Sequence, residues 1–186
     1  MDILIFYWYV LTVPADDTES FSRYLPVEED ALRWGFHVVD AGFTEIQPDS
    51  AYPPGKHPEE YRLSWDQGRT LNEYQLVYIT RGRGTFETKE TGRVRIEAGQ
   101  AFILFPGVWH RYHPLRKMGW DENWIGFNGE VAKRIMEGFF SPGKAVIQIG
   151  HDQELLDLIR SVTQLMQQPS PGYQQVMAAR AMEALA

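Results

Sequence analysis

The feature that most restricts the fold is a series of short β-type runs between residues 74 and 127, each separated from the next by a turn. The first run, YQLVYIT, leads into RGRG at residues 81–84, which we predict to be a hairpin turn. Short strands at this spacing are typical of antiparallel sandwiches and barrels. The strands that we expect are Tyr74–Thr80, Thr85–Lys89, Arg93–Glu97, Ala101–Phe105, Trp109–Tyr112 and Asn123–Phe127.

The residues before this series have a less regular pattern. Residues 15–33 are polar and acidic and predict a flexible connection. The β-branched and aromatic residues of Trp34–Ile46 predict one or two strands with a bend at Ala41-Gly42. Prolines crowd into residues 48–58 and predict an irregular loop there.

Beyond residue 129 the pattern becomes helical. Glu130–Phe140 predicts a short helix and Ala145–Ile149 a last strand. Asp152 has the side chain of an N-cap for a helix over Gln153–Gln168, and a second helical pattern begins near Tyr173. This chain ends inside the second pattern, so we expect it to be the front part of a longer one.

The first of these two helices has one apolar stripe. Such a stripe is either core or interface, and because two helices follow one another we predict that it forms a homodimer interface. The interface residues that we expect are Leu155, Ile159, Val162 and Met166.

Composition argues against several classes of partner and chemistry. A formal net charge of -7 makes this chain a poor partner for DNA or for an anionic membrane. The absence of cysteine rules out disulfides, thiolate metal sites and a cysteine nucleophile, and it fits a cytoplasmic protein. The apolar start, MDILIFYWYVLTVP, lacks a signal-peptide pattern and is too short to span a bilayer, so we expect a strand or an arm there.

His110 and His113 follow an apolar strand and raise the question of a metal site. Gly99, Pro106-Gly107 and His110 resemble the second signature of the cupin barrels, in which the histidine is a metal ligand. The other three ligand positions implied by this resemblance hold Arg69, Leu71 and Gln75. A divalent cation needs three or four good donors, and strand positions three apart face opposite sides. We therefore predict no metal, no cofactor and no catalytic residue.

Longer stretches resemble the N-terminal domain of AraC-family transcription regulators, a family named after the arabinose regulator. The stretches are RYLPVEEDALRWGFHVVDAGFTEI, GRTLNEYQLVYITRGRGTFE, FPGVWHRY and GWDENWIGFNG. The resemblance implies a mainly β fold, a cupin-like jelly-roll barrel that holds a small effector, followed by two C-terminal α-helices that dimerise. We expect an N-terminal arm and lead-in at residues 1–33, the barrel at 34–150 and the helical segment at 151–186. A helix-turn-helix DNA-binding domain would belong to the full-length protein and is absent from this chain.

The resemblance also implies which residues contact the effector. Thr44, Arg69, Tyr112 and Trp124 match pocket positions of the arabinose regulator, whereas Glu122 stands where that regulator has a histidine. The face of a tryptophan, surrounded by groups that hydrogen-bond hydroxyls, suits a carbohydrate. With the cupin histidine included, the predicted effector-binding residues are Thr44, Arg69, His110, Tyr112, Glu122 and Trp124.

We expect a non-enzymatic, effector-sensing and dimerisation domain of a bacterial transcription regulator. Its partners would be a sugar or a similar small polar molecule and a second copy of itself, with DNA reached only through the absent domain and no membrane contact. One alternative is a metal-dependent cupin enzyme, an isomerase or dioxygenase that binds metal through His110. Another is a dimerisation module whose barrel is filled by side chains such as Tyr112 and Trp124 and binds nothing.

Overall fold

The computed structural model describes residues 20–54, 61 and 63–186, so most of the predicted N-terminal arm lies outside the described residues. The helices and strands, in chain order, are β1 (Ser20–Tyr24), α1 (Glu29–Trp34), β2 (His37–Ile46), β3 (Tyr74–Thr88), β4 (Gly92–Glu97), β5 (Gln100–Leu104), β6 (His110–Pro114), β7 (Trp120–Asn128), α2 (Glu130–Phe139), the 3-10 helix η2 (Pro142–Lys144), β8 (Val146–Gln148), α3 (Gln153–Gln167) and α4 (Tyr173–Glu183).

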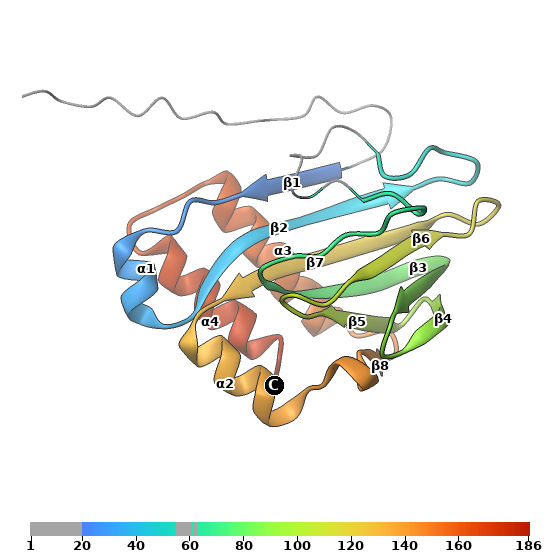
Figure 1. Ribbon diagram of the computed structural model, residues 1–186. Helices are drawn as coiled ribbons and strands as arrows, with labels where there is room; N and C mark the ends of the chain where they lie inside the picture. The colour runs from blue at the N-terminus through green and yellow to red at the C-terminus, as the bar shows by residue number, and fades with distance from the viewer. Residues whose placement is uncertain (1–19, 55–60, 62) are drawn as a thin grey trace, which may run out of the picture.

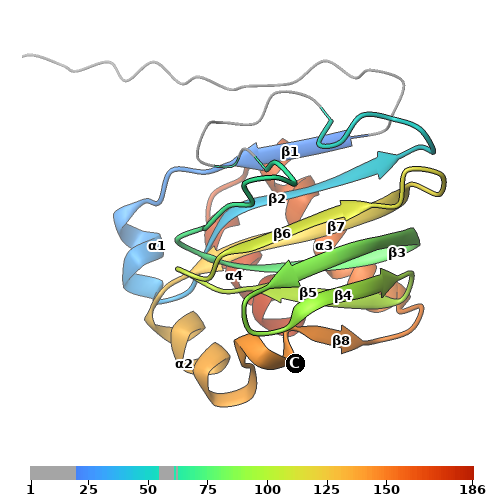
Figure 2. The ribbon, with the colours of Figure 1, turned by 45° about the vertical axis from the view of Figure 1, so that its right-hand side comes forward.

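The strands of the described chain pair antiparallel and form two sheets that face each other (Figures 1 and 2). The larger sheet has the order β1-β2-β7-β3-β5-β8. The smaller sheet consists of β4, the second half of β3 and β6. Two helices follow the strands at the C-terminus, so the predicted fold, a cupin-like barrel followed by two helices, is confirmed. No helix in the described ranges is long and apolar enough to cross a membrane.

β3 is one continuous strand of 15 residues, so the prediction of a hairpin turn at RGRG is wrong. Its first half pairs with β7 and β5, and its second half pairs with β4 and β6. Gly82 has a φ of 83°, and a Cβ there would lie 2.1 Å from the carbonyl oxygen of Gly119. A Cβ on Gly84 would lie 2.3 Å from the ring of Trp120. The two glycines let the strand bend from one sheet into the other without ending.

Three predictions for the N-terminal part are also wrong. The expected flexible connection contains β1 and α1, and Trp34 ends α1 instead of beginning a strand. β2 runs unbroken past Ala41-Gly42. Gly42 makes room for the ring of Trp124 instead of bending the strand, because a Cβ at this position would lie 2.4 Å from that ring.

The helices α3 and α4 pack against the outer face of the larger sheet, behind β2 and β7 in Figure 1. α3 begins at the predicted position because the side chain of Asp152 accepts a hydrogen bond of 3.0 Å from the amide of Leu155. The predicted interface residues are between 0% and 8% exposed and belong to the core of the protomer: Leu155, Ile159, Val162 and Met166. Their assignment to a dimer interface is therefore corrected, whereas dimerisation itself stays a prediction.

Candidate functional site

The inner face of the larger sheet brings together predicted site residues from two neighbouring strands. The register of β2 and β7 places Thr44 opposite Glu122 and Gly42 opposite Trp124. Residues two apart on a strand share a face, so Glu122 and Trp124 point to the same side, as the sequence predicts. Gly42 leaves the space that the indole ring of Trp124 occupies.

A third row on this face joins Asp40 to Gln75 across Gly126. Because Gly126 has no side chain, the carboxyl of Asp40 lies over it; a Cβ there would be 1.8 Å from Asp40 Oδ2. Gln75 Nε2 donates to Asp40 Oδ1 at 2.9 Å, and Trp124 Nε1 donates to the same oxygen at 2.8 Å. Asp40 therefore orients both the indole and the amide. Sequence reasoning missed Asp40, although an acidic residue inside an apolar strand and a glycine inside another were visible signals.

Asp40 is 1% exposed, and its Oδ2 has no hydrogen-bond partner among the described residues. Burial is the main cause that raises the pKa of Asp40 to about 7, and the charge of Glu73 adds to it. The hydrogen bond from Trp124 acts in the opposite direction. A carboxyl with this pKa takes up and releases a proton near neutral pH.

Arg69 lies in the segment before β3, and each nitrogen of its guanidinium has a protein partner. Nε donates to Nε2 of His110 at 3.2 Å, and Nη2 donates to the hydroxyl of Tyr112 at 2.8 Å. Nη1 donates to the backbone oxygen of Tyr61 at 2.7 Å. The backbones of Arg69 and His110 also exchange two hydrogen bonds of 2.9 Å. The guanidinium therefore orients the neighbouring side chains.

His110 is a buried, neutral ring in this arrangement. Its Nδ1 lies 3.0 Å from the backbone oxygen of Val108, so Nδ1 holds the proton and Nε2 accepts from Arg69. Burial, together with the positive charge of Arg69, lowers the pKa of His110 to about 3. The lone pair that would bind a metal is thus occupied by a guanidinium. His113 lies against Trp65 instead, with ring centroids 4.1 Å apart. Within the ranges described, no group of three or more His, Asp or Glu side chains could hold a metal ion.

Glu122 has a partner that sequence reasoning missed. Tyr52, from the proline-rich loop after β2, donates its hydroxyl to Glu122 Oε2 at 3.1 Å. Burial raises the pKa of Glu122 to about 7, and the hydrogen bond from Tyr52 and the charge of Arg69 oppose this shift. No sequence motif marks Tyr52, because it acts from an irregular loop whose path depends on the rest of the fold.

Four of the six predicted effector-binding residues line one small cavity, which we call the inner chamber: Arg69, Tyr112, Glu122 and Trp124. Its wall also includes Tyr24, Tyr52, Tyr61 and Gln75. The chamber has a volume of about 30 Å³, enough for a water molecule or two. The other two predicted residues do not line this chamber: Thr44 hydrogen-bonds to Ser20, and His110 accepts a hydrogen bond from Arg69.

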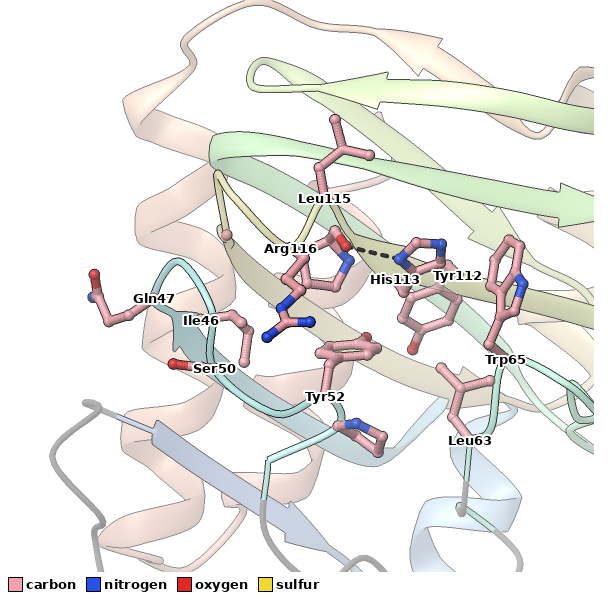
Figure 3. Close-up of a pocket in the computed structure, with 13 residues that line it drawn as sticks. Ile46, Gln47, Ser50, Tyr52, Leu63, Trp65, Tyr112, His113, Leu115 and Arg116 are labelled. Carbon is pink, nitrogen blue, oxygen red and sulfur yellow. Dashed lines mark hydrogen bonds between the residues drawn. The ribbon is translucent and has the colours of Figure 1, made fainter.

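A larger cavity of about 350 Å³, which we call the outer pocket, lies next to the inner chamber. The two cavities share four wall residues: Tyr52, Pro53, Leu63 and Tyr112. Figure 3 shows Tyr52 in the middle of the outer pocket, between Ile46 and Arg116 on one side and Leu63 and Trp65 on the other. The volume of the outer pocket falls within the range of small-molecule sites.

The chain is similar to several solved structures and matches one family of known proteins. Similar solved structures are YhaK from Escherichia coli (15% identity, TM-score 0.43, 70% of this chain and 50% of that one), the cupin domain of Cnp3 from Schizosaccharomyces pombe (14%, 0.38, 74% and 83%) and a predicted oxalate decarboxylase from Thermotoga maritima (16%, 0.37, 59% and 80%). This chain thus spans half the length of YhaK. No curated protein matches it. Residues 57–185, most of the chain, match the family described as AraC-like ligand binding domain. The chain therefore belongs to the family of AraC-like ligand binding domains, as its resemblance predicts.

Proposed function

We propose that this chain senses a small-molecule effector for a bacterial transcription regulator and binds it inside the barrel. The observation behind the proposal is the inner chamber, where Glu122 and Trp124 lie on one wall and Asp40 holds the indole of Trp124 in place. Membership of a ligand-binding family supports a barrel that takes a ligand over one that is only filled.

The effector that best suits this chamber is a sugar or a similar hydroxyl-bearing molecule. The carboxyl of Glu122 already accepts a hydrogen bond from one hydroxyl, that of Tyr52. An effector hydroxyl at this place would replace that bond with one of the same kind. Trp124 offers an aromatic surface to the C–H groups of a sugar ring.

Binding would act on transcription by shifting populations between arrangements of the full-length protein. We propose that two copies pair, with DNA contacted through a further domain. Because the apolar stripe of α3 is inside the protomer, pairing would use residues that remain exposed, such as Val176 on α4. Sedimentation velocity tests the pairing, and a single monomeric species over the whole accessible concentration range would contradict it.

A thermal-shift screen of mono- and disaccharides tests the effector. We expect a stabilising sugar whose affinity falls about tenfold, or about 1.4 kcal/mol, in both Glu122→Gln and Trp124→Phe. Trp34→Phe is the matched control, because Trp34 is exposed on α1. A sugar that binds all three variants as it binds the wild type would place its site elsewhere and contradict the proposal.

The competing function is a metal-dependent cupin enzyme. It requires a metal bound through His110, whose Nε2 accepts a hydrogen bond from Arg69. Elemental analysis of the purified protein separates the two functions. Stoichiometric iron, manganese, nickel or zinc that is lost in His110→Ala would favour the enzyme.

A further inference from the structure

We propose that the effector has two parts, a hydroxylated group that enters the inner chamber and an aromatic or branched alkyl group that fills the outer pocket. An aryl glycoside is a molecule of this class. The inference rests on the proposed function, since it assumes that the hydroxylated group binds beside Glu122.

The first argument is the size of the inner chamber. About 30 Å³ is far below the several hundred Å³ typical of ligand sites, so no sugar fits until a wall residue moves. The outer pocket, at about 350 Å³, lies on the other side of that wall. A molecule that reaches Glu122 by displacing the shared wall therefore extends into the outer pocket.

The second argument identifies the wall residue that moves. Tyr52 lines both cavities and belongs to the irregular loop between β2 and β3, outside any helix or strand. Its hydroxyl donates to Glu122, and its ring centroid lies 6.0 Å from that of Trp120 and 6.4 Å from that of Tyr112. Rotating this one side chain joins the cavities and leaves both sheets intact.

The third argument is the chemistry of the outer pocket. Six of the thirteen residues that line it have apolar side chains: Ile46, Pro53, Leu63, Trp65, Pro114 and Leu115. The rings of Tyr52 and Tyr112 add to this apolar surface. Trp65 is held in position, because the guanidinium carbon of Arg111 lies 4.3 Å from its ring centroid and His113 packs against it. Such a rigid apolar wall favours a flat or branched apolar group, which gains free energy by leaving water.

Tyr52 itself shows the pattern that the effector would copy. Its hydroxyl donates to Glu122. Its aromatic ring lies in the outer pocket, as Figure 3 shows. An effector with a hydroxyl joined to an apolar ring would take over both contacts. A sugar alone would take over only the first.

Fluorine NMR of protein labelled with 5-fluorotryptophan tests the inference, because Trp124 reports on the inner chamber and Trp65 on the outer pocket. The probes are phenyl and methyl glycosides of glucose, galactose and arabinose, and the exposed Trp34 is the internal reference. We expect one phenyl glycoside to shift both Trp124 and Trp65 and to bind at least tenfold more tightly than its methyl counterpart.

Each other outcome has a separate meaning. If phenyl and methyl glycosides bind equally and shift Trp124 alone, the inference is overturned and the proposed function stands. Shifts confined to Trp65 overturn the inference and also count against a sugar in the inner chamber. Failure of every glycoside to shift either resonance overturns both.

A filling variant provides a second test. Ser50 is exposed at the rim of the outer pocket, so Ser50→Phe should fill the pocket without touching the inner chamber. We expect it to remove the advantage of the phenyl glycoside and to leave the methyl glycoside unchanged. Ser170→Phe, in the exposed connection between α3 and α4, is the matched control. An unchanged advantage in Ser50→Phe would overturn the inference.

Discussion

β7 separates two buried surfaces that are built from different chemistry. On its outer face, Ile125 and Phe127 join the apolar core beneath the C-terminal helices. On its inner face, Glu122 and Trp124 face the chamber, and Asp40 holds the indole from the neighbouring strand. Burying a carboxyl costs free energy, so the inner face lowers stability where the outer face raises it. Such a cost is expected at a binding site, where polar groups must stay available to a ligand.

The largest effect should come from the outer face. Ile125→Ala removes a fully buried side chain and leaves a cavity, so we expect the free energy of unfolding to fall by about 2–5 kcal/mol. Arg134→Ala, at an exposed position of α2, is the control and should change it by less than about 0.5 kcal/mol. Urea denaturation measures both. Equal effects of the two variants would remove the distinction between the faces.

The buried carboxyls of the inner face should make the free energy of unfolding depend on pH. Asp40 and Glu122 have a pKa raised to about 7 in the folded state, so below that pH the folded state binds more protons than the unfolded state. Their burial therefore lowers the free energy of unfolding as pH rises from about 4 to 7. We expect Glu122→Gln and Asp40→Asn each to reduce this loss by about 1–3 kcal/mol. Urea denaturation from pH 4.5 to 8 measures it, and slopes equal to the wild type would contradict the pKa shifts.

The smallest effect should come from Tyr52→Phe, which keeps the ring and removes one hydrogen bond. We expect the free energy of unfolding to fall by about 1 kcal/mol. Because the hydroxyl of Tyr52 opposes the rise in the pKa of Glu122, the pH midpoint of that carboxyl should rise further. An effector that displaces Tyr52 should bind more tightly to this variant. Calorimetric titration with the best phenyl glycoside measures the gain, and weaker binding would show that Tyr52 contacts the effector instead of giving way to it.

The sequence predicts local features of the fold well and long-range ones less well. The N-cap at Asp152 and the strand over Arg93–Glu97 depend on neighbours in the chain, and both predictions are confirmed. The path of RGRG is not decided by its neighbours in the chain, because a glycine with positive φ suits a hairpin turn and a bend within a strand equally. What decides between them is contact with Gly119 and Trp120, far along the chain. The apolar stripe of α3 likewise indicates that one face of the helix is buried. The pattern alone does not say whether that face packs on the protomer's own sheet or on a second copy.

The residues of the candidate site show the same difference between local and long-range features. Family resemblance supplied Arg69 and Trp124 because motifs fix their positions in the chain. Asp40 was missed because its role depends on the register that places it over Gly126. Tyr52 was missed because a proline-rich loop has no periodicity from which the direction of a side chain can be predicted. Which residues of the site act together is therefore a property of pairing between distant strands.

The unbroken course of β3 has a consequence for cooperativity. This strand is hydrogen-bonded on both sides, first within one sheet and then within the other. Its amides should therefore exchange with solvent only when the whole barrel unfolds, whereas β1, at the edge of the larger sheet, should exchange through local opening. The two sheets then form one cooperative unit with Gly82 at its corner, and a ligand between them would slow exchange in both sheets together.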